Sequence, residues 1–138
     1  MEQAKVIASV EAQNSGDTYT TQVTMGKHRL VADEPIAVGG QELGPTPGDY
    51  LCMSLASCKA ITLRMYAQRK NWEVGEIRVK ASLVKGEGEA SGLNTFYCSV
   101  HFTGSLSEEQ LKRLLEIAKK CPIDRLLIKP SEVVTILE

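Results

Sequence analysis

The chain has 138 residues, of which 43% are hydrophobic and 24% charged, and its formal net charge at pH 7 is −1. This length suits a single domain, residues 1–138, built around one core. The near-neutral charge excludes a strong electrostatic attraction to nucleic acid or to an anionic membrane, and four Tyr, two Phe and one Trp are too dispersed to stack bases.

The N-terminal residues 1–5 lack the apolar core of a signal peptide, and no apolar run approaches the roughly 20 residues that span a bilayer. We therefore expect a cytoplasmic protein with no membrane or nucleic-acid partner. In that reducing compartment the four cysteines are not a structural disulfide framework. They are core residues, metal ligands or redox-active thiols.

The first third of the chain predicts strands and turns. Residues 5–13 alternate apolar and polar side chains, and residues 18–25 are rich in Thr, Tyr and Val. A Gly-Lys turn leads into a third strand over residues 28–32, so we expect a meander. Residues 33–47 hold three glycines and three prolines and predict a loop.

A long helix is expected from Pro47 to about Lys70. Thr46 suits the N-cap, Pro47 the first helical position, and Asp49 complements the helix dipole in the first turn. Residues 50–63 are nearly apolar, which predicts a central, buried helix. A stripe with spacings of three and four residues runs along it: Leu51, Leu55, Cys58, Thr62 and Met65.

Three further strands are expected in the second half. Two long ones cover about residues 73–85 and 93–103, joined by a polar, glycine-rich connector over residues 86–92. Residues 132–137 are expected to close the chain as a strand.

Two helices are expected between these strands. Ser107 and Gln110 form the pattern of a capping box, which begins a helix with an apolar face. Cys121 and Pro122 end that helix or begin a short one over residues 123–127. Together the elements predict a single α+β domain.

Cys58 and Cys121 are the strongest candidates for chemistry. Cys58 lies among small residues inside the long helix, as a small buried hydrophobe or as a working thiol. Cys121 follows two lysines at a helix junction, where positive charge and a helix N-terminus both favour the reactive thiolate. For Cys52 and Cys98 simple packing is the favoured interpretation.

Other chemistries find little support in the sequence. It contains no Cys-x-x-Cys pair, and no phosphate loop, nucleophile elbow or Rossmann fingerprint. A composite metal site of Cys58, Cys121, His28 and His101 stays open, although no spacing indicates it. We expect no cofactor and no metal.

Two motifs are recognisable. Pro47 opens the long helix, a run of small residues follows, and then comes Cys58; after the second helix, Cys121 opens a Cys-Pro segment. These motifs resemble the OsmC/Ohr family of osmotically inducible and organic hydroperoxide resistance proteins. The order of the strands also fits, so the resemblance covers nearly the whole chain.

The resemblance implies an OsmC-like fold, in which antiparallel sheets pack around a long central helix in an interwoven homodimer. It implies a cysteine-based peroxidase that reduces organic hydroperoxides in oxidative-stress defence. Cys58 would be the peroxidatic cysteine and become a sulfenic acid. Cys121 would resolve it to a disulfide, which a dithiol then reduces.

The resemblance also indicates supporting residues. In the hydroperoxide-resistance branch a glutamate follows the helix-start proline; here Gly48 stands there, and Asp49 comes next. That branch holds the cysteine as thiolate with an arginine from an early glycine-rich turn, for which Arg29 is the candidate. The chain therefore resembles a less characterised OsmC-like subgroup better than the hydroperoxide reductases proper.

Two other functions stay open. A non-enzymatic OsmC-like protein could bind or sense a small molecule, including a redox-sensing role, in the pocket of the same fold. Metal binding through the same thiols is the third possibility.

Overall fold

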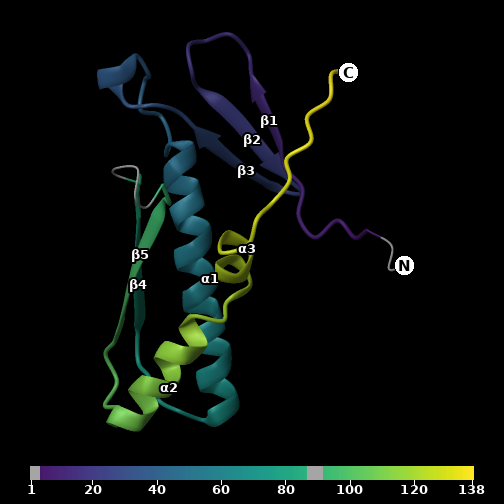
Figure 1. Cartoon of the computed structure of the whole chain (residues 1–138). Helices are drawn as coiled ribbons and strands as arrows, with labels where there is room; N and C mark the ends of the chain where they lie inside the picture. The colour runs from purple at the N-terminus through teal and green to yellow at the C-terminus, as the bar shows by residue number, and fades with distance from the viewer. Residues whose placement is uncertain (1–3, 87–91) are drawn as a thin grey trace. The chain divides into compact units, whose positions relative to one another are not determined.

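The computed structural model describes residues 4–86 and 92–138. The chain divides into two compact units, Met1–Tyr50 and Leu51–Glu138. The first holds an antiparallel sheet, and the second holds a β-hairpin with helices (Figure 1). The longest helix begins in the first unit and continues through the second. A single domain over residues 1–138 therefore stays a prediction.

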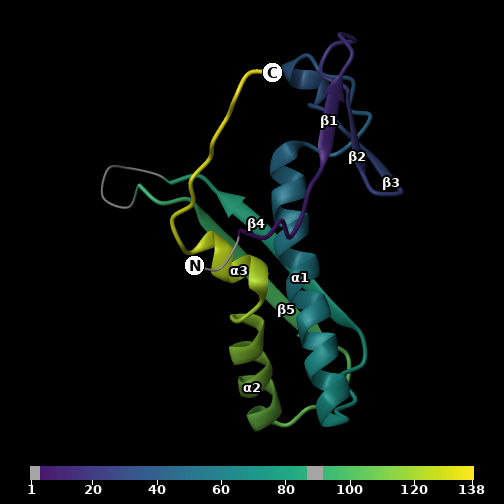
Figure 2. The same cartoon turned by 90° about the vertical axis from the view of Figure 1, so that its right-hand side faces the viewer.

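The N-terminal unit contains the predicted meander (Figures 1 and 2). Its strands are β1 (Glu11–Asn14), β2 (Thr21–Met25) and β3 (His28–Ala32), in the order β1-β2-β3 with both pairs antiparallel. The register places Val23 opposite both Ala12 and Leu30. The prediction over residues 28–32 is confirmed, whereas β1 covers only the end of the predicted first strand.

Asp33 organises the loop that follows the meander. Its buried carboxylate accepts hydrogen bonds from the Thr20 hydroxyl at 2.8 Å and from the N–H groups of Glu34 and Leu43 at 2.8 and 3.2 Å. Burial raises the pKa of Asp33, but these hydrogen bonds outweigh it and hold the pKa below its usual value. Gly44 passes so close to the Val31 carbonyl that a Cβ there would collide with it.

Helix α1 (Pro47–Lys70) starts and ends where the sequence predicts. The Asp49 N–H donates to the Thr46 hydroxyl oxygen at 3.1 Å, and the Thr46 N–H donates to the Asp49 carboxylate at 3.0 Å. This reciprocal pair satisfies N–H groups that the first helical turn cannot bond internally.

The buried face of α1 differs from the predicted stripe. Leu51 and Met65, at the two ends of that stripe, are 41% and 60% exposed in the single chain. The buried face lies about a quarter turn further round the helix. Its members are Leu55, Lys59, Leu63, Tyr66 and Ala67. Leu55 belongs to both the stripe and the buried face, because the other elements of the C-terminal unit pack on the neighbouring side of α1.

The C-terminal unit packs a hairpin and two helices with α1 (Figure 2). Strands β4 (Ile77–Val84) and β5 (Thr95–Phe102) pair antiparallel, and α2 (Glu108–Ala118) is followed by α3 (Pro122–Leu127). The buried core of this unit consists of Leu63, Tyr66, Ala67, Val74, Leu114 and Ala118. The predicted connector overlaps residues 87–91, which lie outside the described residues.

The capping box at α2 is confirmed. The Gln110 N–H donates to the Ser107 hydroxyl oxygen at 3.1 Å, and the Ser107 N–H donates to the Gln110 side-chain oxygen at 2.9 Å. The short helix after Cys121 is confirmed as α3.

Both ends of the chain depart from prediction. Residues 5–10 and 132–137 were expected in strands, but neither segment forms one in the described part of the chain. Val6 and Ile136 are both 81% exposed. These strand predictions are wrong for the single chain because no neighbouring strand pairs with either segment, and a strand needs such a partner for its backbone groups.

None of the helices in residues 4–86 and 92–138 has the length and apolar character that crossing a membrane requires.

Candidate active site

The structure brings Cys58 and Cys121 together within the C-terminal unit. Cys58 is half-buried on α1, and Cys121 is fully buried between α2 and α3. Their side chains are close enough for Cys58 to influence the pKa of the Cys121 thiol. The two cysteines come from segments far apart in the sequence, so the fold of this unit creates their proximity.

Burial dominates the chemistry of Cys121. It raises the pKa of the Cys121 thiol; the Asp124 N–H, 3.4 Å from Sγ, and the Lys59 charge lower the pKa, while Cys58 raises it. The net pKa is raised, which contradicts the expectation that the lysines and the helix start would make Cys121 a thiolate. The neighbouring Cys58 side chain raises the pKa of Cys121 and so favours its protonated thiol.

The buried Lys59 and the partly buried Asp124 form an ion pair beside the two thiols, which sequence reasoning missed. The Lys59 Nζ lies 2.6 Å from Asp124 Oδ2 and donates a second hydrogen bond to the Ala118 carbonyl at 2.7 Å. A signal existed, because Lys59 is the one charged residue in the nearly apolar stretch 50–63.

Asp49 and Arg29 belong to the N-terminal unit, and both cysteines belong to the C-terminal unit. The Asp49 carboxylate is engaged in the cap of α1 with Thr46. Arg29 is an exposed residue of β3, opposite Thr24. Their part in the cysteine site stays a prediction.

An apolar cavity of about 560 Å³ opens next to the ion pair, between β5 and the three helices. Neither Cys58 nor Cys121 is among its lining residues, whose polar members are Lys59, Asn94, Thr95, Cys98, Lys119 and Asp124. Cys98 is exposed rather than packed, although partial desolvation of its thiol by neighbouring atoms raises its pKa. Simple packing therefore does not describe Cys98 in the single chain.

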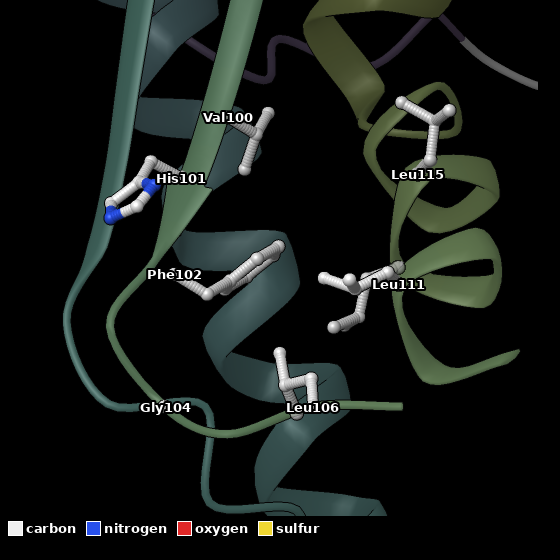
Figure 3. Close-up of a pocket in the computed structure, with 8 residues that line it drawn as sticks. Val100, His101, Phe102, Gly104, Leu106, Leu111 and Leu115 are labelled. Carbon is white, nitrogen blue, oxygen red and sulfur yellow. The ribbon is translucent and has the colours of Figure 1, made fainter. Parts of the chain in front are cut away.

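A second cavity of about 430 Å³ lies further along β5 and α2 (Figure 3). Phe102 and Leu106 point toward Leu111 across it, and apart from His101 its side chains are apolar. The two cavities share Val100 and Leu115 in their walls.

The part of the chain that the structure describes holds no group of three or more His, Cys, Asp or Glu side chains suited to a metal ion. His28, named in the open metal alternative, lies on β3 in the N-terminal unit, whereas His101 lies on β5.

Comparison with known protein families matches residues 39–136, more than half of the chain, to the family described as OsmC-like protein. This chain belongs to the OsmC-like protein family. A comparison with curated proteins finds no match.

Solved structures share the OsmC-like fold. A protein from Psychrobacter arcticus 273-4 is 17% identical, with a TM-score of 0.72 over 89% of this chain and 90% of that one. An organic hydroperoxide resistance protein OsmC from Legionella pneumophila is 19% identical, with a TM-score of 0.62 over 90% of both chains. The organic hydroperoxide resistance protein OhrB of Bacillus subtilis is 23% identical, with a TM-score of 0.59 over 88% and 90%.

The fold prediction is therefore confirmed as α+β, with antiparallel sheets and a long helix in the OsmC-like arrangement. At 16–23% identity the solved structures establish the fold alone. The chemistry of this OsmC-like protein has to be argued from its own thiols and the groups that contact them.

Proposed function

We propose that this OsmC-like protein is a cysteine-based peroxidase that reduces organic hydroperoxides through a two-cysteine cycle. The observation that supports it best is the proximity of Cys58 and Cys121, in which a buried thiol with a raised pKa lies beside a partly exposed one. A thiol next to a newly oxidised cysteine captures it as a disulfide before further oxidation.

In the first step the Cys58 thiolate attacks the O–O bond of the hydroperoxide. An S–O bond forms, the O–O bond breaks, and the leaving alkoxide takes a proton to become an alcohol. Cys58 is oxidised to a sulfenic acid, and the peroxide is reduced. Of the two thiols Cys58 suits this role, because it is partly exposed whereas Cys121 has no exposed surface.

In the second step the Cys121 sulfur attacks the Cys58 sulfenic sulfur. An S–S bond forms, the S–O bond breaks, and the departing hydroxide combines with the Cys121 proton as water. Cys121 is suited to carry that proton because its pKa is raised. A dithiol partner then reduces the disulfide by exchange and is itself oxidised to a disulfide.

The substrate class and setting follow from the same residues. Ile61 lies one turn from Cys58 on α1 and is exposed in the single chain, so an organic hydroperoxide with an apolar body suits this surface better than hydrogen peroxide. A dithiol reductant is available in a reducing compartment, which makes the cytoplasm and a role in oxidative-stress defence part of the proposal. Asp49 and Arg29 remain proposed supporting residues.

A homodimer is also part of the proposal. Leu51, Ile61 and Met65 share one face of α1, are exposed in the single chain, and have Cys58 among them. Contiguous exposed apolar side chains of this kind mark an interaction surface. A second copy of α1 would cover this face and bring each Cys58 to the boundary between subunits.

The test is a comparison of three serine variants with an organic hydroperoxide and a dithiol. Cys58→Ser is expected to lower turnover by about 1,000-fold or more, because the nucleophile is lost. Cys121→Ser should consume one hydroperoxide per chain and then stop. Cys52→Ser is the matched control on α1 and should turn over within about twofold of the parent.

Mass mapping after peroxide treatment should identify a Cys58–Cys121 disulfide. Unchanged turnover in Cys58→Ser would rule out the peroxidase. Saturable binding of the hydroperoxide without its consumption would instead favour the non-enzymatic binding or sensing protein.

A further inference from the structure

Lys59 connects α1 to both sides of Cys121. Only 4% of its surface is exposed, and its ammonium group donates to the Ala118 carbonyl and to the Asp124 carboxylate. Ala118 precedes Cys121 by three residues and Asp124 follows it by three. One ammonium group therefore holds the end of α2 and the first turn of α3, with Cys121 between them.

This ion pair is unexpected as a stabilising device. Removing two charges from water is costly, and replacing a buried pair by apolar side chains is often neutral or stabilising. Lys59 adjoins Cys58 in the sequence, and the Asp124 N–H donates to the Cys121 sulfur. Both members of the pair are thus tied to the two thiols, which indicates a role in the site.

We propose that the Lys59–Asp124 pair positions Cys121 against Cys58 and thereby sets the rate of disulfide formation, while leaving the attack on the hydroperoxide unaffected. This inference rests on the peroxidase proposed above. Lys59 and Asp124 act through Cys121 and are positioning residues.

The need for such a device follows from the local structure. Helix α3 has six residues, and so short a helix is not stable by itself. A disulfide forms only within a narrow range of Cα separation and dihedral angle, so small displacements of Cys121 slow its formation steeply. Lys59 fixes α3 to α1, which carries the target sulfur.

A secondary electrostatic effect acts in the same direction. The Lys59 charge lowers the pKa of Cys121, opposing the larger effect of burial. The Lys59 charge therefore favours the loss of the Cys121 proton as this sulfur attacks Cys58. Asp124 holds the Lys59 ammonium group in place.

The experiment separates the two steps in single turnovers with cumene hydroperoxide as the probe. Peroxide loss reports the attack by Cys58, and mass analysis of acid-quenched samples reports the disulfide. Lys59→Met should leave the rate of peroxide loss within about threefold and slow disulfide formation by about tenfold or more. Its sulfenic acid should persist long enough to be trapped by a dimedone-type reagent and to oxidise further to sulfinic acid.

Two further variants keep the test decisive. Lys59→Met leaves the partly buried Asp124 without its partner, so the double variant Lys59→Met with Asp124→Leu replaces both charges by apolar groups and should fold while still resolving slowly. Lys112→Met, an exposed lysine on α2, is the matched control and should leave both rates unchanged.

The inference is overturned if the folded double variant forms the disulfide at the parental rate, or if both steps slow by the same factor. With either outcome the proposed peroxidase function is still supported, provided that the parent protein consumes hydroperoxide. Failure of the parent to consume hydroperoxide refutes the proposed function instead.

Discussion

The two thiols of the site have the same side-chain chemistry and different surroundings. Cys121 is enclosed between α2 and α3, and burial raises its pKa, whereas Cys58 remains partly exposed on α1. The sequence indicates the reverse for Cys121, since it shows two adjacent lysines and a helix start but not the packing that excludes water. Burial outweighs both features because a thiolate is poorly solvated in a dry interior.

Asp33 provides a testable prediction about a single residue. Its folded-state pKa is lowered, so its contribution to stability is present above the unfolded value of about 3.9 and is lost as the pH falls through the folded value. Asp33→Asn should lower the melting temperature at pH 7 by on the order of 5 °C, because three hydrogen bonds lose their charged acceptor.

Thermal unfolding between pH 7 and pH 3 measures the effect. The difference in melting temperature between the parent and Asp33→Asn should narrow as the pH falls and the Asp33 carboxylate of the parent is protonated. Asp17→Asn, at an exposed turn, is the control and should change little at any pH. A gap that stays constant down to pH 3 would mean that the charge of Asp33 is not the cause.

Among the secondary-structure elements, helices with strong end signals are the ones that the sequence predicts best. Thr46 and Pro47 define the start of α1, and Ser107 with Gln110 defines the start of α2, because these signals act over a single turn. Which face of α1 is buried depends on elements that are distant in the sequence. The stripe with spacings of three and four residues lies about a quarter turn from the face that is buried.

Adjacent leucines of α2 test the packing of this element. Leu114 is fully buried in the core of the C-terminal unit, whereas Leu115 is exposed in the single chain. Leu114→Ala should lower the free energy of unfolding by about 3 kcal/mol, through lost burial and the cavity left behind. Leu115→Ala, the matched control, should cost less than about 1 kcal/mol in urea denaturation. Equal losses would contradict the observed orientation of α2.

The candidate site was predictable in part for a similar reason. Cys58 and Cys121 could be named from two motifs, but Lys59 and Asp124 lie 65 positions apart and only tertiary packing pairs them. A lone charge in an apolar helix is the kind of local inconsistency that marks such a site.

At the scale of the whole molecule, several apolar segments are exposed in the single chain. Within the described residues, apolar side chains are exposed on the α1 face formed by Leu51, Ile61 and Met65 and in residues 5–10 and 132–137. A second copy is the occupant proposed above for the α1 face.

Ile61→Glu tests the proposed dimer. An unpaired carboxylate on this face should weaken self-association by about 100-fold or more, because burying it is costly. Sedimentation over a range of protein concentrations measures this, with Lys112→Glu on α2 as a charge-changing control. A parent chain that stays monomeric throughout, or an Ile61→Glu protein that associates as tightly as the parent, would remove the dimer from the proposal.

The Cys121 sulfur also caps α3, where it accepts the Asp124 N–H. In a Cys58–Cys121 disulfide this same sulfur would lie at the N-terminus of α3, so the redox state of the site and the start of the helix share one atom.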